Sequence, residues 1–91
     1  MFDKMYLYYI SCSVAYTETI SYQVLDKPKS YTTTNSILTA FTMTYEKNKI
    51  KTADDVIDLM AAAREAFEKT YPDYSGRITN FIMLGYTKLD E

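Results

Sequence analysis

The chain of 91 residues contains no histidine and no tryptophan, and it has only one cysteine, two glycines and two prolines. Histidine is the side chain most often used for acid–base catalysis near neutral pH, so its absence removes most familiar catalytic sites. One cysteine without histidine offers no zinc-ligand spacing, and two glycines are too few for a phosphate-binding glycine loop. The sequence therefore predicts a protein that is not an enzyme and that carries no metal site and no cofactor.

Charge and length exclude further classes of protein. Ten Lys and Arg against twelve Asp and Glu leave a net charge of −2, which is too balanced for generic nucleic-acid binding. No apolar run approaches the length of a membrane span, so we expect no membrane association. An apolar content of 47% indicates a folded chain, and 91 residues make one domain, residues 1–91.

Cys12 admits two interpretations. The segment Tyr9-Ile10-Ser11-Cys12 loosely resembles a bacterial lipoprotein cleavage site, in which Cys12 is the acylated residue. Only residues 5–10 offer an apolar run before it, and that run is shorter than an export signal requires. We therefore expect a buried strand cysteine in a protein of the cytoplasm of the producing cell.

Three segments are predicted strands, residues 5–16, 37–45 and 78–88, because aromatic and β-branched residues alternate in them. Residues 20–25 are a fourth candidate, either a weaker strand after a turn at residues 17–19 or the start of a long loop. The segment 26–30 contains Pro28 and is predicted to break regular structure. One face of the first strand is suited to a core throughout: Tyr6, Tyr8, Ile10, Cys12, Val14 and Tyr16.

Residues 53–70 are predicted to form the one helix. Thr52 and Asp55 have the spacing of a capping box, apolar residues recur at helical spacing, and Tyr71-Pro72 ends the helix. The order strand, possible strand, strand, helix, strand predicts an α+β fold. In it, one helix covers one face of a small antiparallel-type sheet of three or four strands.

Asp54-Asp55-Val56-Ile57-Asp58 has the spelling of the aspartate-rich motif by which isoprenoid synthases hold magnesium diphosphate. Those enzymes are large all-helical bundles, which a chain of this length is too short to build. The aspartates lie in the first helical turns, where compensation of the helix dipole explains them. We therefore expect them to be structural.

The face of the sheet away from the helix is predicted to stay apolar, through Leu7, Tyr9, Leu38, Ala40, Phe81 and Met83. Isolated monomers rarely expose a contiguous apolar patch of more than roughly a few hundred Å². We therefore expect this face, or the edge of the sheet, to be covered by another copy of the chain or by a target protein.

Tyrosine is the residue present in excess, with ten copies. Many of them belong to strand faces, whereas others lie at less regular places, where aromatic side chains more often serve recognition. The lysines at 47, 49 and 51 indicate either a solvated loop or, together with Arg77, an anion-binding rim. The candidate binding residues are Tyr22, Tyr31, Tyr71, Tyr74, Arg77, Lys47, Lys49 and Lys51.

Two segments carry a family resemblance: Ile50-Lys51-Thr52-x-x-Asp55 opens the helix, and Ile78-x-Asn80-Phe81-Ile82-x-Leu84 forms the closing strand. With the layout of residues 37–89, they resemble small accessory proteins encoded by phages and mobile elements. Such proteins are frequently non-enzymatic inhibitors of host defence, which act on a defence protein or sequester its nucleotide signal. The resemblance implies a non-catalytic protein that binds a host protein, and the apolar second face implies self-association. The alternative is an oligomeric sponge that holds a signalling nucleotide between tyrosines and Lys or Arg.

Overall fold

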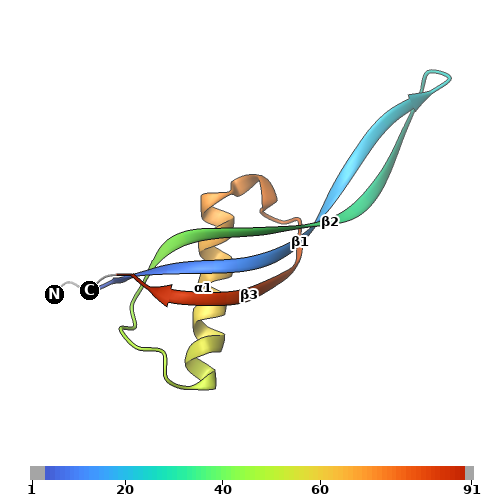
Figure 1. Cartoon of the computed structure of the whole chain (residues 1–91). Coiled ribbons are helices and arrows are strands. Elements are labelled where there is room, and N and C mark those ends of the chain that lie inside the picture. The colour runs from blue at the N-terminus through green and yellow to red at the C-terminus, as the bar shows by residue number, and fades with distance from the viewer. Residues whose placement is uncertain (1–3, 90–91) are drawn as a thin grey trace.

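The computed structural model describes residues 4–89. Its elements follow the order β1 (Tyr6–Val24), β2 (Lys27–Tyr45), α1 (Ala53–Thr70), a short 3-10 helix (Pro72–Tyr74) and β3 (Ile78–Lys88). The strands form one antiparallel sheet in the order β2-β1-β3, and α1 lies across one face of it (Figure 1). The predicted α+β class and the order of elements are confirmed.

The first two strands are one long hairpin, which the sequence analysis divided wrongly. β1 runs without a break through the turn expected at residues 17–19, and it pairs with β2 from Tyr6↔Tyr45 to Val24↔Lys27. The predicted break at residues 26–30 is wrong because β2 is an edge strand, where Pro28 loses no hydrogen bond within the sheet. Residues 32–36 also belong to β2.

The distal part of this hairpin projects from the body of the protein as a two-stranded arm, which we define as residues 17–34 (Figure 1). β3 begins at Ile78, opposite Tyr16, so the third strand ends where the arm starts. The molecule measures 61 × 27 × 20 Å and has a radius of gyration of 17.3 Å. A compact domain of this length has a radius of gyration of about 12 Å, so the arm makes the protein markedly elongated.

The helix has the predicted bounds and caps. Thr52 accepts a hydrogen bond from the Asp55 backbone N–H, and the Asp55 side chain accepts one from the Thr52 backbone N–H, which completes the capping box. At the other end, the Tyr71 N–H donates to the Phe67 carbonyl at 2.8 Å before Pro72 stops the helix.

The core lies between α1 and the sheet. Leu59, Ala63 and Phe67 are fully buried on the inner side of the helix. They pack on the predicted core face of β1 and on its neighbours, of which the most buried are Tyr8, Ile10, Cys12, Val14, Phe41 and Phe81. Burial of these apolar side chains drives the association of helix and sheet.

β3 corrects the predicted faces of the sheet. Phe81 pairs with Val14 and Met83 with Cys12, so both lie on the helix side, and Phe81 is buried. Both were expected on the opposite face. The register shifts between Ser11 and Cys12 and again between Ala15 and Tyr16, so simple alternation from the strand ends assigns the wrong side.

The side of the sheet that α1 leaves uncovered is called the open face here. In the body it consists of the odd-numbered residues 7–15 of β1, the even-numbered residues 36–44 of β2, and residues 80, 82, 85 and 87 of β3. Its large apolar side chains are solvent-exposed, with Leu38 78% exposed, Ile82 46% and Tyr9 44%.

Candidate functional site

The arm separates its residues by chemistry into two faces. One face continues the side that α1 covers in the body, and it carries Glu18, Ile20, Tyr22, Val24, Lys27, Lys29, Tyr31 and Thr33. The other face contains only small or neutral polar residues and Pro28. We call the first of these the aromatic face of the arm.

Two predicted binding residues meet on the aromatic face. The rings of Tyr22 and Tyr31 lie edge to face, with their centroids 5.9 Å apart, and about half of each side chain is exposed. Ile20 is directly opposite Tyr31 in the register, and Lys29 is opposite Tyr22. The result is an exposed apolar strip with a positive charge beside it.

The tip of the arm is an unusual turn. Leu25 and Asp26, which connect the strands, both have positive φ, 52° and 65°. Positive φ at both positions is the requirement of a type I′ turn, which Asn-Gly normally satisfies. Leu25 is also 90% exposed, so the chain holds a bulky apolar residue at a position unfavourable in both conformation and solvation.

The base of the arm gathers three further candidates, Tyr71, Tyr74 and Arg77. Tyr74 packs against Tyr16 with centroids 4.8 Å apart, and the Arg77 guanidinium carbon lies 5.5 Å from the Tyr16 ring centroid. Tyr71 and Tyr74 both contact the buried Phe67 ring. These contacts give the cluster a structural role: it joins the arm and the helix end to the body.

Arg77 is already committed to backbone partners. Its Nε donates to the Thr17 carbonyl at 2.8 Å, and Nη1 donates to the Asp73 carbonyl at 2.8 Å. A guanidinium with two directions satisfied in this way has fewer donors available for an external anion. A small cavity of about 200 Å³ beside Tyr71 and Tyr74 is lined by these two residues and by Ile37, Thr39 and Phe67.

The candidate lysines lie elsewhere. They follow the end of β2 opposite to the arm tip, and residues 31–45 of an extended strand span roughly 46 Å. The structure therefore does not bring Lys47, Lys49 and Lys51 near Tyr22 and Tyr31 within one chain. Lys49 and Lys51 are exposed, as a solvated loop requires.

Lys47 is an internal partner of the helix start. Its Nζ is 2.9 Å from Asp55 Oδ1 and 3.4 Å from Asp58 Oδ2. The hydrogen bond from Lys47, with those from the Lys51 and Thr52 backbone N–H groups, holds the pKa of Asp55 well below its usual range. The same bond with Asp55 raises the pKa of Lys47.

The aspartate-rich segment therefore serves the helix cap and an ion pair. Among residues 4–89, no group of three or more His, Cys, Asp or Glu side chains is placed to hold a metal ion. Tyr45 is buried beside this region, and its burial raises the pKa of its hydroxyl.

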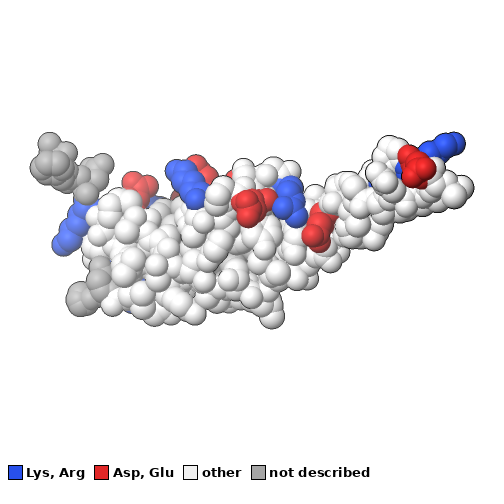
Figure 2. Space-filling model, turned by 90° about the horizontal axis from the view of Figure 1, so that it is seen from above, with Lys and Arg blue, Asp and Glu red and all other residues white. Residues whose placement is uncertain are grey.

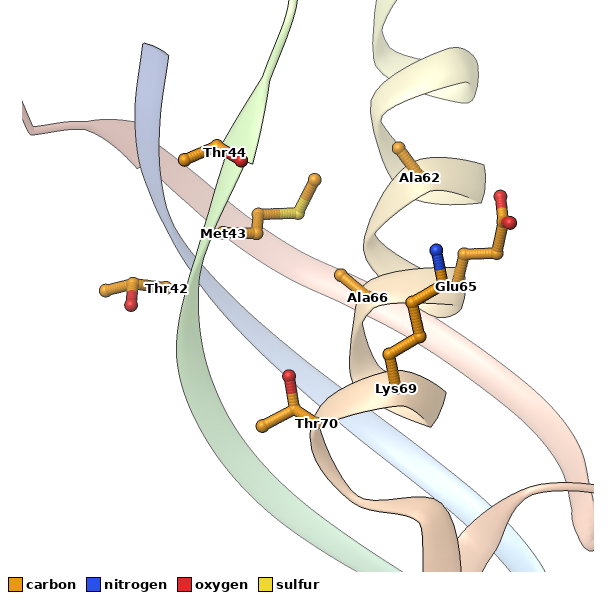
Figure 3. Close-up of a pocket in the computed structure, with 8 residues that line it drawn as sticks. All are labelled: Thr42, Met43, Thr44, Ala62, Glu65, Ala66, Lys69 and Thr70. Atoms are coloured by element: carbon orange, nitrogen blue, oxygen red, sulfur yellow. The ribbon is translucent and has the colours of Figure 1, made fainter. Parts of the chain in front are cut away.

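A hollow lies between α1 and β2 (Figure 3). Its volume is about 350 Å³, and it is lined by Thr42, Met43, Thr44, Ala62, Glu65, Ala66, Lys69 and Thr70. In Figure 3 the Thr42 side chain points away from the helix, and the Glu65 and Lys69 side chains extend along the helix. The lining lacks the convergent polar groups and apolar enclosure typical of small-molecule sites.

Sequence reasoning did not select Ile20 and Val24 of the exposed strip, or Leu25 at the tip of the arm. A signal for them exists in the sequence: residues 17–24 and 27–34 alternate in matching register around a two-residue spacer. Without glycine or asparagine in the spacer, that hairpin signal lacks its usual mark.

No helix among residues 4–89 is long and apolar enough to cross a membrane. Comparison of the chain with known protein families, with curated proteins and with solved structures found no match.

Proposed function

We propose that the protein is a non-catalytic binding protein whose aromatic arm engages a partner protein. The observation that carries this proposal is the arm itself. Its apolar strip of Ile20, Tyr22, Val24 and Tyr31 continues the core face of the sheet beyond the helix, where none of residues 4–89 covers it.

The low intrinsic stability of the arm supports a role in binding a partner. An isolated two-stranded hairpin is marginally stable in water, so a projecting arm with half-exposed aromatic residues gains little by itself. Leu25 adds to this, because bulky residues with positive φ are uncommon and cluster at functional positions. A partner that buries the tip and the tyrosines converts these unfavourable features into binding energy.

The chemistry of the aromatic face indicates the kind of partner surface. Tyrosines supply large contact areas with few rotatable bonds, and Lys27 and Lys29 flank them near the tip. A partner with an apolar groove and an acidic rim complements this face.

The class of partner follows the resemblance to phage and mobile-element accessory proteins. On that basis we place the protein among the inhibitors of host defence, acting on a host protein in the host-cell cytoplasm. The layout of residues 37–89 and its two segments support this part of the proposal.

The nucleotide sponge is the weaker candidate. It requires tyrosines beside Lys or Arg, and on the arm only Lys27 and Lys29 flank the tyrosines. The predicted lysines follow the far end of β2, Lys47 is paired with two carboxylates, and Arg77 is bonded to backbone carbonyls. A sponge that uses the predicted lysines therefore has to assemble its site from residues of different subunits.

Capture from host-cell extract, followed by mass spectrometry, tests the proposal. Tagged wild-type protein is compared with Tyr22→Ser and Tyr31→Ser, and Tyr86→Ser on β3 is the matched control because its side chain is also partly exposed. We expect one host protein to be captured by the wild type and by Tyr86→Ser, and to be lost with the two arm variants.

Equal capture by all variants contradicts a role for the arm. Small molecules released by denaturing the purified protein are identified in the same experiment. An intact nucleotide recovered in equal amount with the protein supports the sponge instead, and turnover of an added nucleotide panel overturns both functions.

A further inference from the structure

The open face carries no charged residue at any of its positions in the body of the protein. Charged residues make up about a quarter to a third of a typical soluble surface, so an exposed face of this size should contain several. The charged residues of the three strands lie on the helix side instead, and they are Glu18, Lys27, Lys29 and Lys88. Figure 2 shows charged side chains along the upper margin of the body and on the arm, while the lower margin is uncoloured apart from its left end.

Large and small side chains of the open face are arranged in complementary patterns on the two sides of a central row. The row Ala40–Ser11–Gly85 crosses the three strands and consists of small residues only. Tyr9, two residues before Ser11 in β1, projects from the middle strand between Thr42 and Thr87. Ser13, two residues after Ser11, is a small residue between the large side chains of Leu38 and Ile82.

This arrangement is its own complement. A two-fold axis along the small row turns one open face onto another and reverses the strand direction. Tyr9 of each copy then lies over Ser13 of the other, between Leu38 and Ile82, and Leu38 lies over Thr42. Small residues meet at the axis, where they let two sheets approach to their usual packing distance of about 10 Å.

We propose that the open face is the interface of a homodimer, in which two sheets pack face to face about Ser11 with the helices outside. The absence of charge means that two identical faces meet without like-charge repulsion. Ser11 donates within its own chain to the Gly85 carbonyl, so the central hydroxyl needs no water when it is covered.

The size of the face indicates a weak dimer. The open face spans about nine residues along each of three strands, which gives a flat footprint of roughly 400 Å² per copy. Stable interfaces bury at least about 600 Å² per partner. The relief of the side chains adds to this area. We therefore expect dissociation in the micromolar range. A second copy also extends the small core of a chain of 91 residues.

Sedimentation equilibrium and light scattering, from about 1 µM to about 200 µM, test the interface. We expect the wild type to approach twice the chain mass of 10.6 kDa with rising concentration. Leu38→Glu, at a side chain that is 78% exposed, leaves the core intact and should keep the mass of one chain throughout. Leu25→Glu introduces the same charge at the arm tip, and it should dimerise as the wild type does.

A paired substitution tests the register. The two-fold about Ser11 places residue 38 over residue 42 of the other copy, so Leu38→Glu combined with Thr42→Lys should restore at least part of the dimer. A wild type that stays monomeric, a Leu38→Glu variant that still dimerises, or dissociation by Leu25→Glu overturns the interface. Failure of Thr42→Lys to restore the dimer overturns the register.

Dimerisation through the open face and partner binding through the arm can be separated by experiment. If the arm alone binds the partner, monomeric Leu38→Glu still captures it. A variant that loses capture but still dimerises therefore identifies a defect in the arm. A variant that loses the dimer but still captures the partner identifies a defect in the open face.

Discussion

Arg77 Nε donates to the carbonyl of Thr17 at 2.8 Å, and the Thr17 N–H donates to the Arg77 carbonyl at 2.9 Å. This reciprocal pair lies where the third strand ends and the arm begins. The Arg77 guanidinium also lies over the rings of Tyr16 and Tyr74. One side chain therefore ties the first residue of the arm to the segment that follows the helix.

Replacing Arg77 by lysine should loosen the arm. A single ammonium does not reproduce two directed hydrogen bonds and the planar contact with two rings. Because hydrogen bonds to charged groups contribute about 1.5–3 kcal/mol and Arg77 is partly exposed, we expect Arg77→Lys to lower the free energy of unfolding by about 1–2 kcal/mol. Amide exchange should also become faster in residues 17–24. Arg64→Lys on the exposed helix surface is the control, and equal stability of both variants would argue against the clamp.

Replacing both turn residues of the arm should stabilise the turn. Leu25→Asn with Asp26→Gly supplies the residues that a type I′ turn favours and removes a left-handed leucine, which costs about 1–2 kcal/mol. We expect slower amide exchange in the arm, and yet weaker partner capture because the Leu25 side chain is lost. Leu25→Val, which is β-branched, should have the opposite effect on exchange. Faster exchange in the Asn-Gly variant would contradict this account of the turn.

The helix start should give the protein a defined sensitivity to acid. The folded-state pKa of Asp55 is depressed, so its contribution to stability is present above the unfolded pKa of about 3.9 and is lost as the pH falls below it. We expect Asp55→Asn to be less stable than the wild type near neutral pH, with the difference shrinking at lower pH. Melting temperatures measured from about pH 6 to about pH 3 show this.

The matched control for this acid effect is Asp54→Asn, which removes the same charge one residue earlier, where the side chain makes none of these bonds. A melting temperature that depends on pH equally in both variants would contradict the assignment of the effect to Asp55.

Cys12 should be unreactive in the folded protein. It is fully buried on the core face of β1, and burial raises the pKa of its thiol, so little thiolate forms. We expect an aromatic disulfide reagent to modify it slowly in buffer and rapidly in denaturant. Thr19→Cys on the exposed arm supplies a fast-reacting reference in the same protein. Equally fast modification of Cys12 in buffer would show that the core opens readily.

Several features follow from the sequence because they depend on local spacing. The bounds of α1, the Thr52–Asp55 capping box and the stop at Tyr71-Pro72 are all local, and the structure has each of them as predicted. The core face of β1 was also predictable, since a strand without bulges exposes alternate residues to one side. These features settle the fold class.

Tertiary pairing decided the rest. Without Gly or Asn at residues 25–26, only the register of two long strands identifies the hairpin, and so the arm and its exposed strip were missed. The shifts in β3 moved Phe81 and Met83 to the helix side, because an extra residue reverses which face the following side chains occupy. The length of β2 separated the lysines from the arm tyrosines. The absences in the sequence limit the chemistry of this chain, but pairing between distant strands determines which surfaces stay open for binding.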